Sequence, residues 1–231
     1  MTTRLAAAAD AEKAAGMAAY MYGRRYQAMY PDAAERIPLL GAQKPARAPV
    51  MRELLREYPA GSSAEYRDGV LELWALPHRE ERYMAIGFAA AYPEFQRYEN
   101  LDLYRRLIVE GAWWDFVDDV AIRCVGTVLM VDRRQMSPQL DRWIAADDLW
   151  LRRTALIAHI KHKGQTNVDQ LLRHCLFVAG ETEFFIRKAI GWALREHAKT
   201  DPDVVRSFLI DHRDELSGLS FREASKHLEL D

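Results

Sequence analysis

Apolar residues recur at three- and four-residue intervals along most of the chain, the spacing that places side chains on one face of an α-helix. No segment alternates apolar and polar residues for long enough to indicate a β-strand. The pattern therefore predicts an all-α protein. The expected helices cover residues 51–58, 63–76, 79–92, 99–111, 117–131, 149–163, 168–179, 183–199 and 203–216.

Helix-start signals stand near several of these segments. Two pairs match the capping box, in which a hydroxyl and a carboxylate each bind a free backbone N–H: Ser62 with Glu65, and Ser220 with Glu223. Two others place a capping residue before a proline at the first helical position, where the missing N–H costs nothing: Ser137-Pro138 and Asp201-Pro202.

The expected helices follow one another through short connections, which favours antiparallel helix pairs. Trp114, Trp150 and Trp192 lie 36 and 42 residues apart, close to the length of a HEAT-like two-helix repeat of roughly 40 to 47 residues. Short helices need a stacking partner on two sides, so we expect a HEAT-like solenoid with a concave face. No linker divides the chain after residue 60, and we expect one domain over residues 1–231.

The composition is that of a folded globular protein, with 49% hydrophobic and 29% charged residues. No run of 18 apolar residues indicates a membrane-spanning helix, and residues 1–16 are a poor signal peptide because they lack a continuous apolar stretch. Cys124 and Cys175 have no CxxC spacing, which argues against a disulfide framework or structural zinc. We therefore expect a cytoplasmic protein.

The charges are spread unevenly. The whole chain has 32 Lys and Arg against 34 Asp and Glu, which is unusual for a nucleic-acid binder. Residues 142–199 nevertheless contain ten cations and six anions. A basic sector on an acidic body is consistent with this count, although a linear count leaves open whether the cations share a face.

Residues 111–119 place a tryptophan and an aspartate on one helical row. Trp114 and Asp118 are four residues apart, Ile122 and Gly126 continue the row, and a buried stripe is expected beside it, formed by Val117, Val120, Ala121, Cys124 and Val125. One interpretation is a core tryptophan with aspartates that cap the helix. The other is functional, because a carboxylate beside a large aromatic ring needs a partner or a role.

Residues 147–155 place Trp150 and Arg153 in the first turns of a helix that Asp147 or Asp148 caps. The simpler interpretation is a capped helix with surface arginines. The alternative is that Arg153 points into a groove and binds a phosphate or a carboxylate through its planar fork of donors.

Residues 181–196 combine aromatic and cationic side chains. Phe184, Lys188 and Trp192 share one row, and the core side is expected to be Phe185, Ala189 and Leu194. Gly191 inside a strong helical pattern suggests the close approach of another backbone. Together with Trp192, the cations would suit a sugar–phosphate backbone, although a solvated face is the alternative: Arg187, Lys188 and Arg195.

The sequence motifs do not indicate a metal site, a cofactor site or another class of catalytic site. His159 and His162 are three residues apart, but no further His or Cys completes a metal-ligand set, so we expect surface histidines and no metal. The chain has no GxSxG, no glycine-rich phosphate loop and no HExxH, and no cofactor is expected.

Three segments, WWDFVDD at 113–119, residues 149–163 and residues 183–199, resemble the DNA alkylation-repair glycosylases of the AlkD type in their order and spacing. Residues 200–228 are similar to that family's C-terminal helices, and Leu39-Leu40-Gly41 with Pro45 and Arg47 to its N-terminal part. The resemblance implies HEAT-like repeats with a concave DNA-binding face. Residues 20–38 are lengthened relative to the family, which leaves DNA contacts by Tyr22 or Tyr26 open.

The resemblance also implies an activity and a site. The family removes positively charged N-alkylated purines, such as 3-methyladenine and 7-methylguanine, from duplex DNA without metal or cofactor, with the damaged base still stacked. Carried over residue by residue, Asp118 becomes the catalytic carboxylate, Trp114 and Trp192 become aromatic walls around the deoxyribose backbone, and Arg153 becomes a backbone contact. Gln43 becomes a DNA contact from the N-terminal helices.

A single carboxylate is sufficient for this chemistry. The alkylated purine is already a good leaving group and needs no general acid, and the carboxylate stabilises the positive charge that develops on the sugar as the purine departs. We expect a monofunctional glycosylase that acts as a monomer on alkylated duplex DNA. The alternative is a non-enzymatic HEAT-like scaffold that binds a protein or an unusual DNA structure, in which the same residues serve packing and the surface.

Overall fold

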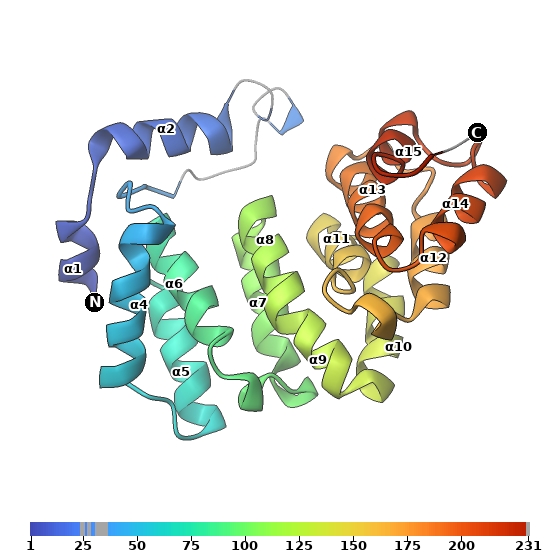
Figure 1. Cartoon of the computed structure of the whole chain (residues 1–231). Coiled ribbons are helices and arrows are strands. Elements are labelled where there is room, and N and C mark those ends of the chain that lie inside the picture. The colour runs from blue at the N-terminus through green and yellow to red at the C-terminus, as the bar shows by residue number, and fades with distance from the viewer. Residues whose placement is uncertain (24–25, 27–28, 31–36, 230–231) are drawn as a thin grey trace. The chain divides into compact units, whose positions relative to one another are not determined.

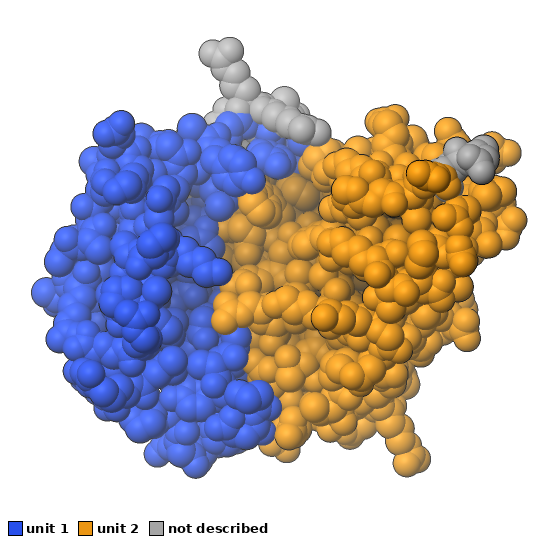
Figure 2. Space-filling model, in the orientation of Figure 1, with its two compact units in different colours: residues 1–95 blue, residues 96–231 orange. Residues whose placement is uncertain are grey.

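The computed structural model describes residues 1–23, 26, 29–30 and 37–229. Every regular element in these ranges is a helix, so the predicted all-α class is confirmed (Figure 1). The chain divides into two compact units, residues 1–95 and 96–231 (Figure 2). The expectation of one domain over the whole chain stays a prediction.

Unit 1, residues 1–95, is a small helical assembly with its own core. Leu5, Val50 and Met84 form a buried cluster that joins the first helix to two later ones. Side chains of Met1, Leu40, Met51 and Leu54 pack around this cluster. The described helices are α1 (Thr2–Ala7), α2 (Ala11–Tyr22), α4 (Lys44–Glu57), α5 (Ser63–Trp74) and α6 (Arg79–Ala89), followed by a 3₁₀ turn at Pro93–Phe95.

A buried glutamate fastens the segment before α4. The Glu80 carboxylate accepts hydrogen bonds from the backbone N–H groups of Leu40 (3.0 Å) and Gly41 (2.8 Å). Gly41 has a φ of +83°, and a Cβ there would lie 2.0 Å from the carbonyl oxygen of Asp10. Only glycine fits this position, which explains the Leu-Leu-Gly motif in local terms. Residues 24–25, 27–28 and 31–36 of the lengthened stretch lie outside the described residues.

Unit 2, residues 96–231, contains the three sequence motifs. Within this unit, helix α11 packs against α8, against the π-helix and against α13. The HEAT-like solenoid itself stays a prediction. The helices are α7 (Leu101–Gly111), α8 (Trp114–Val120), a π-helix (Ala121–Val125), α9 (Gly126–Val131), α10 (Arg133–Ile144), α11 (Leu149–Ile157), α12 (Val168–Phe177), α13 (Phe184–Ala198), α14 (Pro202–Asp211) and α15 (Gly218–Ala224), with 3₁₀ turns at Tyr98–Asn100 and Lys163–Gln165.

Three of the expected helix starts are confirmed, each by a side chain that accepts a backbone N–H of the first turn. The capping residues are Ser62 for α5, Asp148 for α11 and Asp201 for α14. The Glu65 half of the first capping box differs, because its carboxylate binds the N–H of Gly61 and not that of Ser62.

Two other expected starts are wrong. Helix α15 begins one turn earlier, where the Ser217 hydroxyl accepts the N–H of Ser220, and Glu223 is used in ion pairs instead of a capping box. Helix α10 begins at Arg133, so Pro138 lies inside it. The earlier start brings Met136 into the helix, where its side chain is fully buried, and that burial offsets the hydrogen bond lost at the proline.

Candidate active site

The helix that contains Asp118 starts after a sharp turn. Helix α7 ends at Gly111, and Ala112 adopts a left-handed φ of 37°. The chain then reverses through the buried Trp113, which precedes the first residue of α8, Trp114. Asp118 follows one turn later, on the same side as Trp114. It is too far from the start to cap the helix, so the capping interpretation does not apply to it.

Helix α8 continues through the π-helix into α9 as one rod (Figure 1). The expected buried stripe of Val117, Val120, Ala121, Cys124 and Val125 is fully buried, as predicted. The expected row from Trp114 to Gly126 is wrong at its far end, because the wider π-turn shifts the row by about one residue. Gly126 is buried against the carbonyl oxygen of Ala158, and Thr127 takes the accessible place.

Asp118 forms a two-pronged ion pair with Arg153 of α11. Arg153 Nε donates to Asp118 Oδ1 at 2.7 Å, and Nη2 donates to Oδ2 at 2.8 Å. The Asp118 side chain remains 15% exposed, whereas Arg153 is only 5% exposed. Burial raises the pKa of the Asp118 carboxyl above its ordinary value, and the Arg153 guanidinium opposes that rise. The pair therefore holds the Asp118 carboxyl group in a fixed orientation at the edge of the protein surface.

The buried Phe185 also holds Arg153 in place. The third nitrogen of Arg153, Nη1, donates to the carbonyl oxygen of Phe185 at 2.6 Å, and its guanidinium lies 5.7 Å from the centre of the Phe185 ring. Trp113 and Trp150 pack on the same phenylalanine, with ring centres 5.8 and 5.0 Å away. All three nitrogens of Arg153 are thus used within the protein. Its expected contact with a DNA backbone stays a prediction.

The two tryptophans named as aromatic walls are both half-buried. Trp114 lies one turn before Asp118 on α8, and Trp192 lies on α13. The predicted faces of α13 are confirmed: Phe185, Ala189 and Leu194 are buried, whereas the row that contains Trp192 is accessible.

The close contact expected at Gly191 is also confirmed. A Cβ there would lie 2.4 Å from Glu223 Cβ and 2.8 Å from the carbonyl oxygen of Ser220, so α15 packs directly on the α13 backbone.

Most of the cations around Trp192 have partners inside the protein. Lys188 Nζ lies 2.9 Å from Glu223 Oε1, and Arg195 Nη1 lies 2.6 Å from Glu223 Oε2. Burial raises the pKa of Glu223, but hydrogen bonds from its cationic neighbours outweigh burial and lower the pKa to about 2. Arg187 donates from Nε to the carbonyl oxygen of Glu181 at 2.9 Å. The roles of Arg187 and Lys188 toward DNA stay predictions.

Gln43 lies in unit 1, whereas the other predicted site residues lie in unit 2. It is exposed, directly before α4, and its side chain makes no capping bond to that helix. The guanidinium of nearby Arg47 lies 4.6 Å from the centre of the Tyr83 ring and donates to the carbonyl oxygen of Ala42. The role of Gln43 also stays a prediction.

The surface histidines expected at 159 and 162 are a wrong prediction, because both side chains are buried. His162 Nε2 lies 2.9 Å from the carbonyl oxygen of Gly126. Burial lowers the pKa of His159 to about 3, so this ring is neutral at physiological pH. Helix α11 ends at Ile157, and the residues that follow place both histidine side chains in the protein interior. The apolar spacing predicts a helix up to residue 163 and does not indicate this turn. No group of three or more His, Cys, Asp or Glu in the described chain could hold a metal ion.

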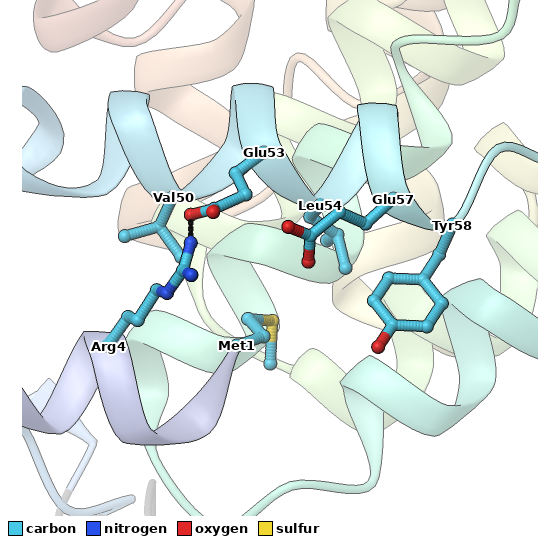
Figure 3. A pocket seen from close by; sticks show the side chains of 7 residues that line it. All are labelled: Met1, Arg4, Val50, Glu53, Leu54, Glu57 and Tyr58. Atoms are coloured by element: carbon cyan, nitrogen blue, oxygen red, sulfur yellow. Dashed lines mark ion pairs between the residues drawn. The ribbon is translucent and has the colours of Figure 1, made fainter.

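The cavities described in unit 1 are lined by other residues than the predicted site. One of about 100 Å³ lies between α1 and α4, where Met1 lies between Arg4 and Tyr58 and an ion pair joins Arg4 to Glu53 (Figure 3). A neighbouring cavity of about 500 Å³ extends over α5 to Phe88. None of the helices in the described ranges is long and apolar enough to cross a membrane.

Sequence reasoning missed the support beneath the site. Phe185 was expected only as core, although it contacts both Arg153 and Trp150. Trp113 was not singled out, although it packs on Trp150 and on Phe185. The run of aromatic residues at 113–114 and 184–185 was the available signal. The pairing of Asp118 with Arg153 was open in the sequence, since each had been expected to need a partner of opposite charge.

Comparisons with known proteins identify the family and the fold. A solved structure described as "Predicted DNA alkylation repair enzyme from Enterococcus faecalis" is 28% identical, with a TM-score of 0.83 over 96% of this chain and 98% of that chain. AlkD2 from Streptococcus mutans is 18% identical, with a TM-score of 0.62 over 78% of this chain and 88% of that chain, a likeness that shows the fold alone. No curated protein matches the chain at a significant level. The DNA alkylation repair enzyme family model matches residues 1–228, and the chain belongs to that family.

Proposed function

We propose that this protein is a monofunctional DNA glycosylase that hydrolyses the N-glycosidic bond of positively charged N-alkylated purines in duplex DNA. The observation on which the proposal rests is the Asp118 carboxylate, which is partly exposed beside a half-buried tryptophan and is oriented by both prongs of Arg153. Family membership supports a role in DNA alkylation repair. The substrates 3-methyladenine and 7-methylguanine come from the resemblance to AlkD-type enzymes.

The proposed reaction needs one carboxylate and one water. The alkylated purine is already cationic, so it departs as a neutral base with the electron pair of its bond to the sugar. The sugar develops oxocarbenium-like positive charge, which the Asp118 carboxylate stabilises across a short distance. The same carboxylate orients a water whose oxygen bonds to the sugar carbon and whose proton is released. The products are a free purine and an abasic site in an uncut strand.

Arg153 serves this reaction as a positioning residue. Each Asp118 oxygen accepts one N–H from Arg153 and keeps a further lone pair, since a carboxylate offers about four acceptor positions. The pair thus fixes the direction of the carboxylate and keeps it ionised without using up its capacity to bind water. A lysine would supply the charge but not the fork of donors.

Trp114 and Trp192 would limit water around the sugar. Both rings are half-buried, so part of each remains available to a ligand. A low-dielectric wall strengthens the attraction between the carboxylate and the cationic sugar. Their assignment as walls of the deoxyribose site follows from the resemblance.

The proposal is tested by comparing two adjacent aspartates. Asp118→Asn should still bind duplex DNA but lose at least about 100-fold of the single-turnover rate of 7-methylguanine release, the usual cost of removing a charge-stabilising group. Asp119 is the matched control, because it lies on the same helix and pairs with Arg123 at 2.9 Å. Asp119→Asn should stay within about threefold of the wild-type rate. Wild-type release by Asp118→Asn would contradict the assignment, and no purine release by the wild-type protein from any methylated duplex would contradict the activity.

A further inference from the structure

A basic surface lies near the C-terminal end of the rod that α8, the π-helix and α9 form, and Asp118 lies near the start of that rod. We call this surface the basic edge, and it consists of Arg133, Arg134, Lys161 and Lys163. Arg133 and Arg134 begin α10, directly after α9, and the two lysines lie in the connection from α11 to α12. Arg133 Nη2 donates to the carbonyl oxygen of Gln165 at 2.6 Å, which joins the two segments into one surface.

The cations of the basic edge are not neutralised by nearby acids. None of the four forms an ion pair with any residue in the described ranges, and Arg134, Lys161 and Lys163 are exposed. The carboxylate of Asp132 accepts the backbone N–H of Tyr98 at 2.8 Å and makes no capping bond to α10. Asp169, near the start of α12, is the exposed acid that follows this connection. The edge therefore has an excess of positive charge.

Two of the four cations lie where the dipole of a helix disfavours positive charge. Arg133 and Arg134 occupy the first turn of α10, the positive end of the helix dipole, and no acidic residue shares that turn. Cations there cost free energy in the isolated protein. A bound anion would offset this cost.

The connection that presents the lysines is held firmly. His162 is buried and lies 2.9 Å from the carbonyl oxygen of Gly126. The backbone N–H of Gln165 donates to the carbonyl oxygen of His162, and Lys163 is held in a left-handed conformation with a φ of 51°. The backbone from which the lysines project is therefore already ordered, so binding a ligand there does not require this connection to be ordered first.

The rod that runs from α8 to α9 connects the candidate site with the start of the basic edge. The rod from α8 to α9 has a single stripe of accessible residues, which runs from the site to its C-terminal end: Trp114, Asp115, Asp118, Asp119, Ile122, Arg123, Thr127, Met130 and Val131. Helix α11 runs beside it in the same direction, since Arg153 meets Asp118 and Ala158 meets Gly126. From Asp118 to the start of α10 the rod is about 20 Å long at the helical rise of about 1.5 Å per residue.

We infer that the basic edge binds the phosphodiester backbone of the same duplex whose sugar faces Asp118, several base steps from the lesion. The inference rests on the proposed function for the placement of the lesion, but not for the charge. A length of about 20 Å corresponds to about six phosphates at 3.4 Å along one strand. Contacts at that distance would set the register of the duplex on the protein without reading its sequence.

The test compares two triple variants of the chain, each of which lacks three positive charges. The edge variant is Arg134→Gln with Lys161→Gln and Lys163→Gln, and Arg133 is kept because it holds the connection. The control variant is Arg106→Gln with Lys199→Gln and Arg206→Gln, three accessible cations that each have a carboxylate neighbour on their own helix. Circular dichroism and urea titration check that both variants fold.

The first measurement is binding to an undamaged 25-base-pair duplex over a range of salt concentrations. We expect the edge variant to bind at least about tenfold more weakly at about 0.1 M salt, with a log–log salt slope smaller by about 2 to 3, since each lost phosphate contact removes about 0.9. The control variant should keep the wild-type slope. Wild-type binding by the edge variant, or an equal loss in the control variant, would overturn the inference.

The second measurement separates this inference from the proposed function. Single-turnover release of 7-methylguanine is followed for a lesion with about four base pairs on each side and for one with about twelve. The edge variant should need about tenfold more protein for half-maximal release from the long duplex only, with an unchanged rate at saturation. An equal requirement for both duplexes would overturn the placement of the edge. If the wild-type protein released no purine while the edge variant still bound DNA weakly, the proposed function would fail and the edge would stand.

Discussion

Asp118 and Glu223 are two carboxylates of unit 2 with nearly the same exposure, 15% and 12% of the side chain. Their pKa values nevertheless move in opposite directions. Burial raises that of Asp118 against a single arginine, whereas Glu223 has a pKa lowered to about 2 because hydrogen bonds from Lys188, Lys226 and Arg195 outweigh its burial. Two carboxylates of nearly equal exposure thus differ in the direction of their pKa shifts.

The number of donors makes the difference. Each oxygen of Glu223 receives two cationic nitrogens, so its acceptor capacity is filled by the protein. Each oxygen of Asp118 receives one N–H, and the carboxylate reaches solvent. A substrate or a water can therefore still bind Asp118, while Glu223 joins α13 to α15.

The largest effect is expected when Asp118 loses its arginine, and the matching change at Glu223 should have a much smaller one. Arg153→Ala should leave Asp118 without a cation and cost about 3 kcal/mol of the free energy of unfolding, and it should lower purine release at neutral pH by about 100-fold. Arg195→Ala leaves Glu223 two lysines and should cost about 1 kcal/mol or less. Urea titration and single-turnover release measure both.

Arg153→Lys keeps the charge and guards against a variant that merely unfolds. The acid limb of its pH–rate profile should lie between those of the wild type and the alanine variant, since part of the attraction to Asp118 is restored. The alanine variant should have its acid limb at the highest pH, because the group that opposes the rise of the Asp118 pKa is gone. Identical profiles for all three proteins would contradict the positioning role of Arg153.

Gly191→Ala should disturb Glu223 and leave Asp118 in place. The new methyl group would lie 2.4 Å from Glu223 Cβ and 2.8 Å from a carbonyl oxygen, so α15 must move away from α13. We expect a loss of about 2 kcal/mol in urea titration, within the range for overpacked sites. Gly180→Ala is the control, because nothing lies within 4 Å of its added Cβ. Equal stability of the two variants would show that the contact does not constrain α15.

Regular helical spacing explains what the sequence could predict. On α13, residues four apart share a face whatever surrounds them, so the accessible row and the buried Phe185, Ala189 and Leu194 followed from the pattern. Gly191 followed from a rule of the same kind, because a glycine costs stability in a helix unless something approaches it. The catalytic role of Asp118 came from a resemblance, and the structure leaves it a prediction.

The remaining features depend on departures from regular spacing or on distant partners. The π-turn after Asp118 buried Gly126 in place of an accessible row position, and no local pattern announces such a turn. Arg153 lies 35 residues from Asp118 in the sequence, and Arg195 lies 28 residues from Glu223. Which opposite charge meets which is decided by packing between helices, and spacing along one helix does not contain that information.

A smaller effect is expected in the dependence of stability on pH. The pKa of Glu223 is about 2 in the folded chain against an ordinary 4.5, so its stabilising contribution is complete above about 4.5 and is lost as the pH falls toward 2. The raised pKa of Asp118 has the opposite sign, because protonation removes a charge that folding disfavours. In acid urea titrations Glu223→Gln should lose stability less steeply than the wild type, and Asp118→Asn more steeply. The same slope for Glu223→Gln and wild type would contradict the first expectation.

The smallest effect is expected for Lys226→Ala. Lys226 is half-exposed and its amino group lies 3.0 Å from both Glu223 oxygens, but solvent screens this contact and a flexible side chain must be ordered to make it. The free energy of unfolding should fall by about 0.5 kcal/mol or less, as for other exposed pairs. Because Lys188 and Arg195 still fill both oxygens, purine release should not change. A loss above about 1 kcal/mol would mean that the three cations act as one network, and the contrast with Asp118 would then rest on cooperation among donors and not on their number.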